Sequence, residues 1–222
     1  MAKQSTNLPD YEGAKAYALR RLERELPSTL FYHSLWHTRD EVAPRAEWLA
    51  EREGLPDVSR LLVGTAAYFH DLGFVEQCHD HELCSALIAE EVLPHFGYSP
   101  VHIDVVTGMI AATRIPQSPR TLLDRILADA DLDVLGRDDF FARNRSLRAE
   151  SAAGGVIVPD SIWYGQQLRF LQQHRYFTAT AREERNAKKR ENLQALRTLI
   201  SECCPLAAEI SAGLLNPSYI AL

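Results

Sequence analysis

The chain has 222 residues, of which 46% are hydrophobic and 24% are charged, a composition typical of a soluble globular protein. A chain of this length can bury a core without disulfides or a structural ion, so any bound metal is expected to be functional. The formal net charge of −6 and the lack of a long basic run disfavour a nucleic acid polymer as partner, and no apolar run reaches the roughly 18 residues of a membrane span.

Helical signals follow one another along the first half of the chain. Apolar residues recur at helical spacing from Val58 to Phe69, and Pro56-Asp57 marks the start of that helix. Gly97 ends the next helical run, and Ser99-Pro100 is typical of an N-cap followed by a first-turn proline.

The second half continues in the same way. Ser118-Pro119 predicts another helix start, ahead of an apolar stripe from Leu122 to Ala130. Gly154-Gly155 predicts a loop, Pro159-Asp160 a further helix, and the spacing from Leu193 to Ile200 a last one.

This order of elements predicts an all-α fold. We expect a single domain over residues 1–222, with a helical core at about residues 28–136 and a helical extension at about 137–222. Four cysteines, at positions 78, 84, 203 and 204, form no CxxC pair, and the N-terminal segment lacks the apolar stretch of a signal peptide. We therefore expect reduced thiols and a cytoplasmic location.

Histidines and carboxylates cluster at the ends of the predicted helices. His33 and His37 share a face if both are helical, whereas a cap at Ser34 would leave His33 just before the helix. The pair His70-Asp71 follows the first apolar stripe, and Gly73 is a natural helix stop. Adjacent side chains on a regular helix diverge by about 100°, so both reach one ion only where the helix ends or distorts.

The third cluster consists of Asp129, Asp131 and Asp133, at alternate positions of an otherwise apolar segment. Unpaired burial of these carboxylates would be costly, so they are either held by a cation or exposed. Each cluster alone is weak, because a histidine at a helix end is more often structural and a DxDxD run is more often a solvated turn. Their combination favours a metal site over a helical scaffold with fortuitous polar helix ends.

Together the three clusters resemble the signatures of the HD-domain superfamily of metal-dependent phosphohydrolases, which are all-helical and have the ligand order His, His-Asp, Asp. The matching stretches are Tyr32–Thr38, Tyr68–Gly73 and Ala128–Asp133. The resemblance covers roughly residues 30 to 136, and the remainder is similar to the helical tail of small bacterial HD proteins. It implies an HD-domain helical bundle with a C-terminal helical extension.

Carried over residue by residue, the resemblance implies four metal ligands: His37, His70, Asp71 and Asp131. Asp129 is the alternative to Asp131, or a group that orients a ligand. Such a mixed N/O site suits a divalent ion, with Mn, Fe, Co, Ni, Zn and Mg all open. The ion would activate a water for attack on phosphorus, and Asp71 would also act catalytically by orienting that water.

The resemblance also implies roles for residues around the ion. In related cyclic nucleotide phosphodiesterases, a histidine four residues before the first ligand protonates the leaving group, and His33 holds this position. Apart from the resemblance, phosphate needs cationic partners, and we expect Arg114 and His81 to bind it. A plain surface arginine is the alternative for Arg114, and Arg39 is a weaker candidate. Relatives with two metals carry a histidine near the position of Thr113, so we expect one tightly bound ion, with a weaker second ion at His81 left open.

We therefore expect a metal-dependent phosphohydrolase, a phosphomonoesterase or phosphodiesterase, acting on a small, nucleotide-like phosphoester. Neither a nucleic acid polymer nor a membrane is an expected partner, and a homodimer is left open. One alternative is a di-iron oxygenase on the same fold, which needs more histidine ligands and is disfavoured by Thr113. The other is a regulatory nucleotide-binding module without turnover, which the intact ligand set disfavours.

Overall fold

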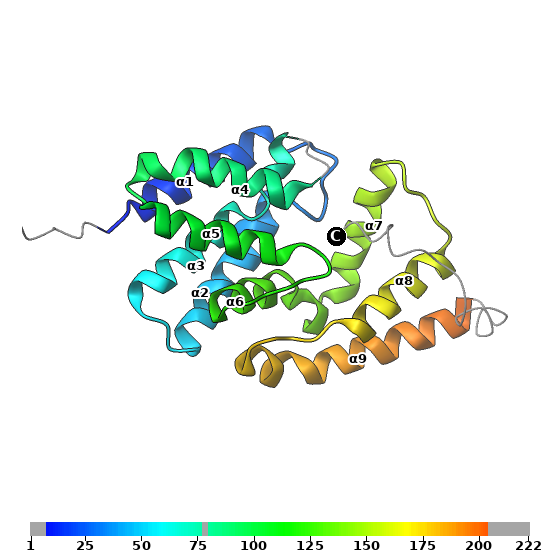
Figure 1. Ribbon diagram of the computed structural model, residues 1–222. Coiled ribbons are helices and arrows are strands. Elements are labelled where there is room, and N and C mark those ends of the chain that lie inside the picture. The colour runs from blue at the N-terminus through cyan, green and yellow to red at the C-terminus, as the bar shows by residue number, and fades with distance from the viewer. Residues whose placement is uncertain (1–7, 77–79, 204–222) are drawn as a thin grey trace, which may run out of the picture. The chain divides into compact units, whose positions relative to one another are not determined.

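The computed structural model describes residues 8–76 and 80–203, and over these residues it contains nine α-helices, short 3-10 turns and one π-helical turn, with no strand (Figure 1). The all-α prediction is confirmed. The chain divides into two compact units between Asp131 and Leu132, close to the expected end of the core at residue 136. Whether both units act as one domain stays a prediction. No helix in the described part of the chain is long and apolar enough to cross a membrane.

The first unit is built around α3. Its elements are α1 (Tyr11–Glu25), the π-helical turn η1 (His37–Val42), α2 (Ala43–Arg52), α3 (Asp57–Phe69), η2 (Leu72–Glu76), α4 (His81–Val92), η3 (Leu93–Phe96), α5 (Pro100–Thr113) and α6 (Leu122–Asp131). Helix α3 packs against α1, α2, α5 and α6, and every residue from Leu62 to Phe69 is buried. The C-terminal part of α3 therefore lies in the interior, and the helix places His70 and Asp71 there.

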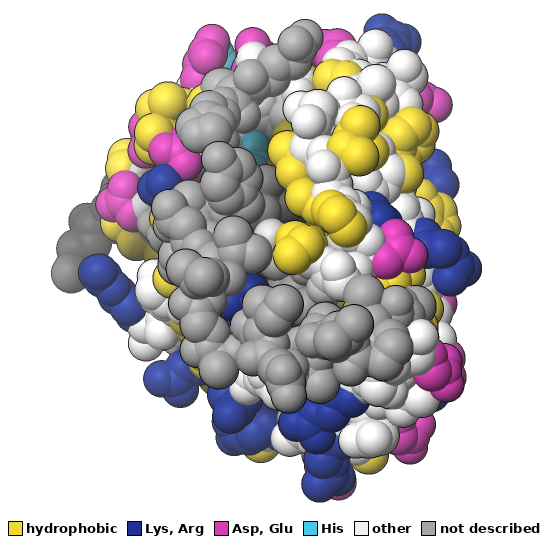
Figure 2. Space-filling view, turned by 90° about the vertical axis from the view of Figure 1, so that its right-hand side faces the viewer, with side chains coloured by type: hydrophobic (Ala, Val, Ile, Leu, Met, Phe, Trp, Pro, Cys, Tyr) yellow, Lys and Arg dark blue, Asp and Glu magenta, His cyan; other side chains and the backbone are white. Residues whose placement is uncertain are grey.

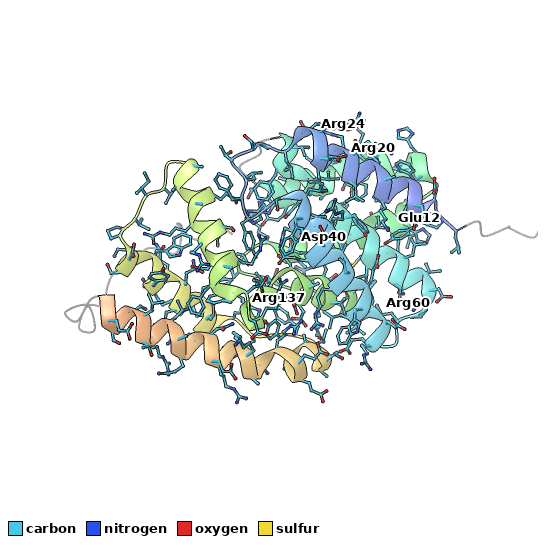
Figure 3. All side chains as sticks on the ribbon, turned by 180° about the vertical axis from the view of Figure 1, so that it is seen from behind. Glu12, Arg20, Arg24, Asp40, Arg60 and Arg137 are labelled. Atoms are coloured by element: carbon cyan, nitrogen blue, oxygen red, sulfur yellow. The ribbon has the colours of Figure 1, made fainter. Side chains whose placement is uncertain are left out.

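Helix α1 extends the core toward the N-terminus, beyond the expected start near residue 28. The Asp10 carboxylate accepts the backbone N–H of Gly13 and caps the helix. Three residues on one face of α1 are buried: Ala14, Ala18 and Leu22. Tyr17 stacks on Phe69, the last residue of α3, with ring centroids 6.3 Å apart. The outer face of α1 carries Glu12, Arg20 and Arg24, which point away from the helices it packs against (Figure 3).

Two helix starts that carry the same sequence signal behave differently. Ser99 caps α5 as predicted, since its hydroxyl accepts a backbone N–H of the first turn. The helix predicted at Ser118-Pro119 begins only at Leu122. There the Asp124 carboxylate accepts the backbone N–H of Thr121 at 2.9 Å, and the Thr121 hydroxyl accepts that of Asp124 at 3.1 Å. This reciprocal cap satisfies two donors, so it sets the start in place of the proline.

The second unit contains the remaining elements: η4 (Asp133–Gly136), α7 (Phe140–Ala153), α8 (Asp160–Gln173) and α9 (Ala179–Cys203). Helix α8 starts at Pro159-Asp160 as predicted and packs along α9. Arg185 on α9 donates two hydrogen bonds to the Asp133 carboxylate, at 2.7 and 3.0 Å. Asn192 donates to the carbonyls of Leu135 and Arg137, at 3.1 and 2.9 Å. Helix α9 therefore holds the η4 turn.

Two further features concern the surface and the cysteines. On the face shown in Figure 2, Lys and Arg side chains gather toward the lower edge, where Asp and Glu side chains lie among them. Cys84 is disulfide-bonded, so the expectation of reduced thiols is wrong at this residue. The other three cysteines lie outside the residues whose side chains the structure describes.

Candidate metal centre

His37 enters the site from an irregular turn. The helix that carries it begins after Ser34, whose hydroxyl lies 3.5 Å from the His37 backbone N–H, so His33 precedes the helix. From His37 on, the backbone forms a π-helical turn, in which Ala43 donates to the carbonyl of Thr38. Such single π-turns recur at functional sites.

His70 and Asp71 occupy the turn that follows α3. The helix ends at Phe69, which lets two adjacent side chains face the same region. Nδ1 of His70 lies 2.8 Å from the carbonyl oxygen of Ala67, one turn back. Both side chains are almost completely buried.

Gly73 lets this turn pack against the start of α4. A Cβ at this position would overlap the backbone carbonyl of His81. The backbone N–H of Gly73 donates to the Ser85 hydroxyl at 2.7 Å. The residue thus does more than end a helix, because its missing side chain permits the close approach that brings His81 to Asp71.

Four side chains from three segments converge in the first unit. Nε2 of His37 lies 3.4 Å from Oδ1 of Asp131 and 3.8 Å from Oδ2 of Asp71. Nε2 of His70 lies 3.6 and 3.3 Å from the same two oxygens. One donor atom from each of His37, His70 and Asp131 lies within 4.8 Å of the others. Ligands about 2 Å from one ion lie about 3 to 4 Å from one another, so this spacing suits a single ion.

Three of the nitrogen and oxygen atoms that face this point make no hydrogen bond with the described residues. Nε2 of His37, Nε2 of His70 and Oδ2 of Asp71 are buried without a hydrogen-bond partner in the described part of the chain. Nδ1 of His37 lies 3.1 Å from Oε2 of Glu41, and Nδ1 of His70 faces the Ala67 carbonyl. Carboxylate and carbonyl oxygens only accept, so each ring donates through Nδ1 and turns Nε2 toward the cluster. This is the form in which imidazole binds a metal, and the residues fit a divalent ion.

The electrostatics of the cluster favour an added positive charge. Burial lowers the pKa of both imidazoles, but Asp131, Asp71 and, for His37, also Glu41 outweigh it, so both pKa values are raised, that of His70 strongly. Burial raises the pKa of both aspartates, but the imidazoles outweigh it and lower the pKa of Asp131 to about 2 and that of Asp71 well below its ordinary range. The carboxylates stay ionised at neutral pH, and protons on the imidazoles compete with a metal.

The three aspartates of the third sequence cluster have different surroundings in the structure. Asp131 is the one whose oxygen reaches both His37 and His70. Asp133 belongs to the second unit, where it pairs with Arg185. Asp129 is completely buried, and its part as ligand or orienting group stays a prediction.

Three aromatic rings lie beside the cluster. His33 and His81 both stack on Phe74, with centroids 4.6 and 4.1 Å away, and their own centroids are 6.0 Å apart. Nε2 of His81 lies 3.7 Å from Oδ1 of Asp71. Burial lowers the pKa of His81. The structure thus brings the expected proton donor and one expected phosphate contact to the Asp71 side of the cluster.

Arg114 lies at the end of α5 with an exposed side chain. Its guanidinium is 2.7 Å from the carboxylate of Asp80, the residue before His81. Its neighbour Thr113 is buried, and the Thr113 hydroxyl donates to the Ile110 carbonyl at 2.8 Å. Thr113 therefore uses its hydroxyl within its own helix.

Sequence reasoning missed Glu41 and Phe74. Glu41 had a signal, because it follows His37 by four residues on a helical segment. The two residues before it, Arg39 and Asp40, pair with each other and are far more exposed than Glu41. Phe74 directly follows Gly73, but nothing in the sequence indicates that two histidine rings stack on it.

The comparisons with known proteins agree with this architecture. Residues 31–133 match the HD domain family. No curated protein matches the chain in sequence. The fold is similar to that of a predicted HD superfamily hydrolase from an uncultured Thermotogales bacterium, with a TM-score of 0.59 and 19% identity over 90% of this chain and 96% of that one. It is also similar to Bacillus subtilis YpgQ in complex with ADP, with a TM-score of 0.61 and 22% identity over 88% and 98% of the two chains.

Proposed function

We propose that this chain, whose residues 31–133 match the HD domain family, is a metal-dependent phosphohydrolase acting on a nucleotide-like phosphate ester. The observation that carries the proposal is the convergence of unpartnered Nε2 atoms of His37 and His70 on the carboxylates of Asp71 and Asp131. Buried polar atoms in proteins are nearly always hydrogen-bonded, so unpartnered atoms at one point favour a bound ligand over a purely structural role. The ADP bound to YpgQ supports a nucleotide as the class of substrate to test first.

The ion's ligands would be His37, His70, Asp71 and Asp131. When bound there, a divalent ion supplies an acidified water and a Lewis acid for a phosphoryl oxygen. The chain supplies the orientation. Oδ1 of Asp71 lies on the His81 side of the carboxylate and can accept a hydrogen bond from the attacking water, which would orient that water.

His33 is the proposed proton donor to the departing alkoxide. The ring is buried and rests on Phe74, with its centroid 6.0 Å from that of the ligand His37. A group at this distance from a ligand is placed to reach a leaving oxygen on a phosphate held at the ion.

Arg114 and His81 are the proposed phosphate contacts. Asp80 competes with the phosphate for the Arg114 guanidinium. The Arg114 side chain is largely exposed, and exposed ion pairs contribute only about 0 to 1 kcal/mol, so a phosphate can displace this partner at small cost. His81 lies next to Asp80 in sequence and next to Asp71 in space.

The test is a substrate panel on metal-stripped protein reloaded with Mn, Fe, Co, Ni, Zn or Mg. The panel contains nucleoside mono-, di- and triphosphates, cyclic nucleotides and sugar phosphates, with released phosphate or nucleoside as readout. We expect at least one metal to restore hydrolysis of a nucleotide. Binding without turnover under all metals would support a regulatory module, and oxygen-dependent turnover with iron would support an oxygenase. Either result would overturn the proposal.

A further inference from the structure

Glu41 lies against the face of His37 that points away from the cluster. Its Oε2 is 3.1 Å from Nδ1 of His37, and the two side chains are only 5% and 2% exposed. Both residues belong to the same π-helical turn. A buried carboxylate on the far nitrogen of a metal-facing imidazole is a common way of fixing a ligand ring.

We propose that Glu41 is a positioning residue of the metal centre. It accepts the Nδ1–H of His37, which leaves the Nε2 lone pair facing Asp131 and Asp71. A carboxylate acceptor also makes the imidazole a stronger donor to the ion, and hydrogen bonds to a charged acceptor are roughly twice as strong as neutral ones. This inference rests on the proposed metal site and adds a side chain outside the ligand set.

The two histidine ligands differ in how they are held. The ring of His70 is fixed by the backbone carbonyl of Ala67, which no substitution removes. The ring of His37 depends on the side chain of Glu41. A defect caused by substituting Glu41 should therefore appear in metal binding while the His70 half of the site stays in place.

The chain offers a matched control in Glu82. Glu41 and Glu82 are both buried, with side chains 5% and 10% exposed, and Oε2 of Glu82 lies 3.5 Å from Nδ1 of a histidine, His81. His81 faces the outer oxygen of Asp71 and is not one of the four proposed ligands. Glu82→Gln thus removes the same charge from a similar environment without touching the orientation of a ligand.

The experiment is a Co²⁺ titration of the full, metal-stripped chain, with a competing chelator to obtain Kd and visible absorption to report the ligand field. We expect Glu41→Ala to raise Kd about 10- to 100-fold, the usual effect of losing such a partner. Glu41→Gln, which keeps the shape and an acceptor oxygen, should have a smaller effect, and Glu41→Asp should restore part of the affinity lost in Glu41→Ala. The Co²⁺ absorption should shift in Glu41→Gln and not in Glu82→Gln.

Unchanged Kd and absorption in folded Glu41→Ala and Glu41→Gln would overturn the proposal while leaving the metal site intact. Equal weakening by Glu82→Gln and Glu41→Gln would also overturn it, because charge alone would then explain the loss. If the unaltered chain binds no Co²⁺, the proposed function fails and this proposal fails with it. Far-UV circular dichroism of each variant separates loss of the site from loss of the fold.

Discussion

Oδ1 of Asp71 lies 3.7 Å from Nε2 of His81, while Oδ2 of the same carboxylate faces the rings of His37 and His70. One carboxylate therefore touches both the proposed ion and the proposed phosphate side of the site. Substitutions at the two ends of this contact should separate the two functions.

We expect Asp71→Ala to abolish turnover and metal retention with helix content intact. His81→Ala should keep the ion and lower kcat/KM about 10- to 100-fold, the range for losing a hydrogen bond to a charged group. Metal content by atomic emission and steady-state kinetics test this pair. Normal turnover by Asp71→Ala would contradict the metal site, and loss of the ion in His81→Ala would make His81 a ligand.

Metal binding should raise the thermal stability of the chain. An ion that binds only the folded state at 100 times its Kd stabilises that state by about 2.7 kcal/mol. We expect Tm to rise with added Mn²⁺ or Zn²⁺ and to fall with chelator, as followed by circular dichroism. His70→Ala is the control, and an equal shift of its Tm would place the binding elsewhere.

Gly73→Ala should destabilise the protein, because its Cβ would overlap the His81 backbone. Overpacking of this kind costs about 1 to 3 kcal/mol or more. Gly108 is the matched control, since it lies within α5 and a Cβ there meets nothing within 4 Å. Gly108→Ala should stabilise by about 0.5 to 1 kcal/mol. Urea unfolding of both variants checks the contrast, and a harmless Gly73→Ala would refute the close approach.

His174 should make stability depend on pH. Burial, together with the charges of Lys189 and Arg175, lowers its pKa to about 3. The unfolded chain takes up this proton near pH 6.5 and the folded chain only near pH 3, so stability is full above pH 6.5 and falls as pH drops through this window. Between pH 7 and 5 the loss is about 2 kcal/mol.

His174→Leu should remove this part of the pH dependence. The measurement is urea unfolding at pH 7 and pH 5, compared with the same change in the unaltered protein. His95 is exposed, so His95→Gln serves as the surface control for replacing a histidine. An identical loss of stability in the His174→Leu variant would show that other groups carry it.

Much of the fold could be predicted from periodicity, because apolar residues recur at helical spacing in helices that pack into the core, as in α3 and α6. Helix α1 was missed because it buries only three residues, and two of them are alanines. The predicted start of α6 at Ser118-Pro119 was wrong because two possible caps lie close together in the sequence. Residue types alone do not decide that the Thr121–Asp124 cap forms.

The residues of the candidate site could be predicted from the sequence, but their arrangement in space could not. His37, His70-Asp71 and Asp131 stand at helix ends in the sequence, and these are the side chains that the structure brings together. The π-helical turn changes the local backbone hydrogen bonding and leaves no mark in the composition of the segment. The proposed positioning role of Glu41 therefore depends on its distance to His37, which the sequence does not give.

The complete burial of α3 from Leu62 to Phe69 has a consequence for how the site works. A helix enclosed in this way is among the last parts of a protein to exchange its amide protons. The turn that carries His70 and Asp71 directly follows the last residue of this helix. Its conformational freedom is therefore lost when the chain folds, so the proposed metal site would be preorganised before an ion binds. Swapping one ion for another should leave the slow-exchanging amides of α3 unchanged.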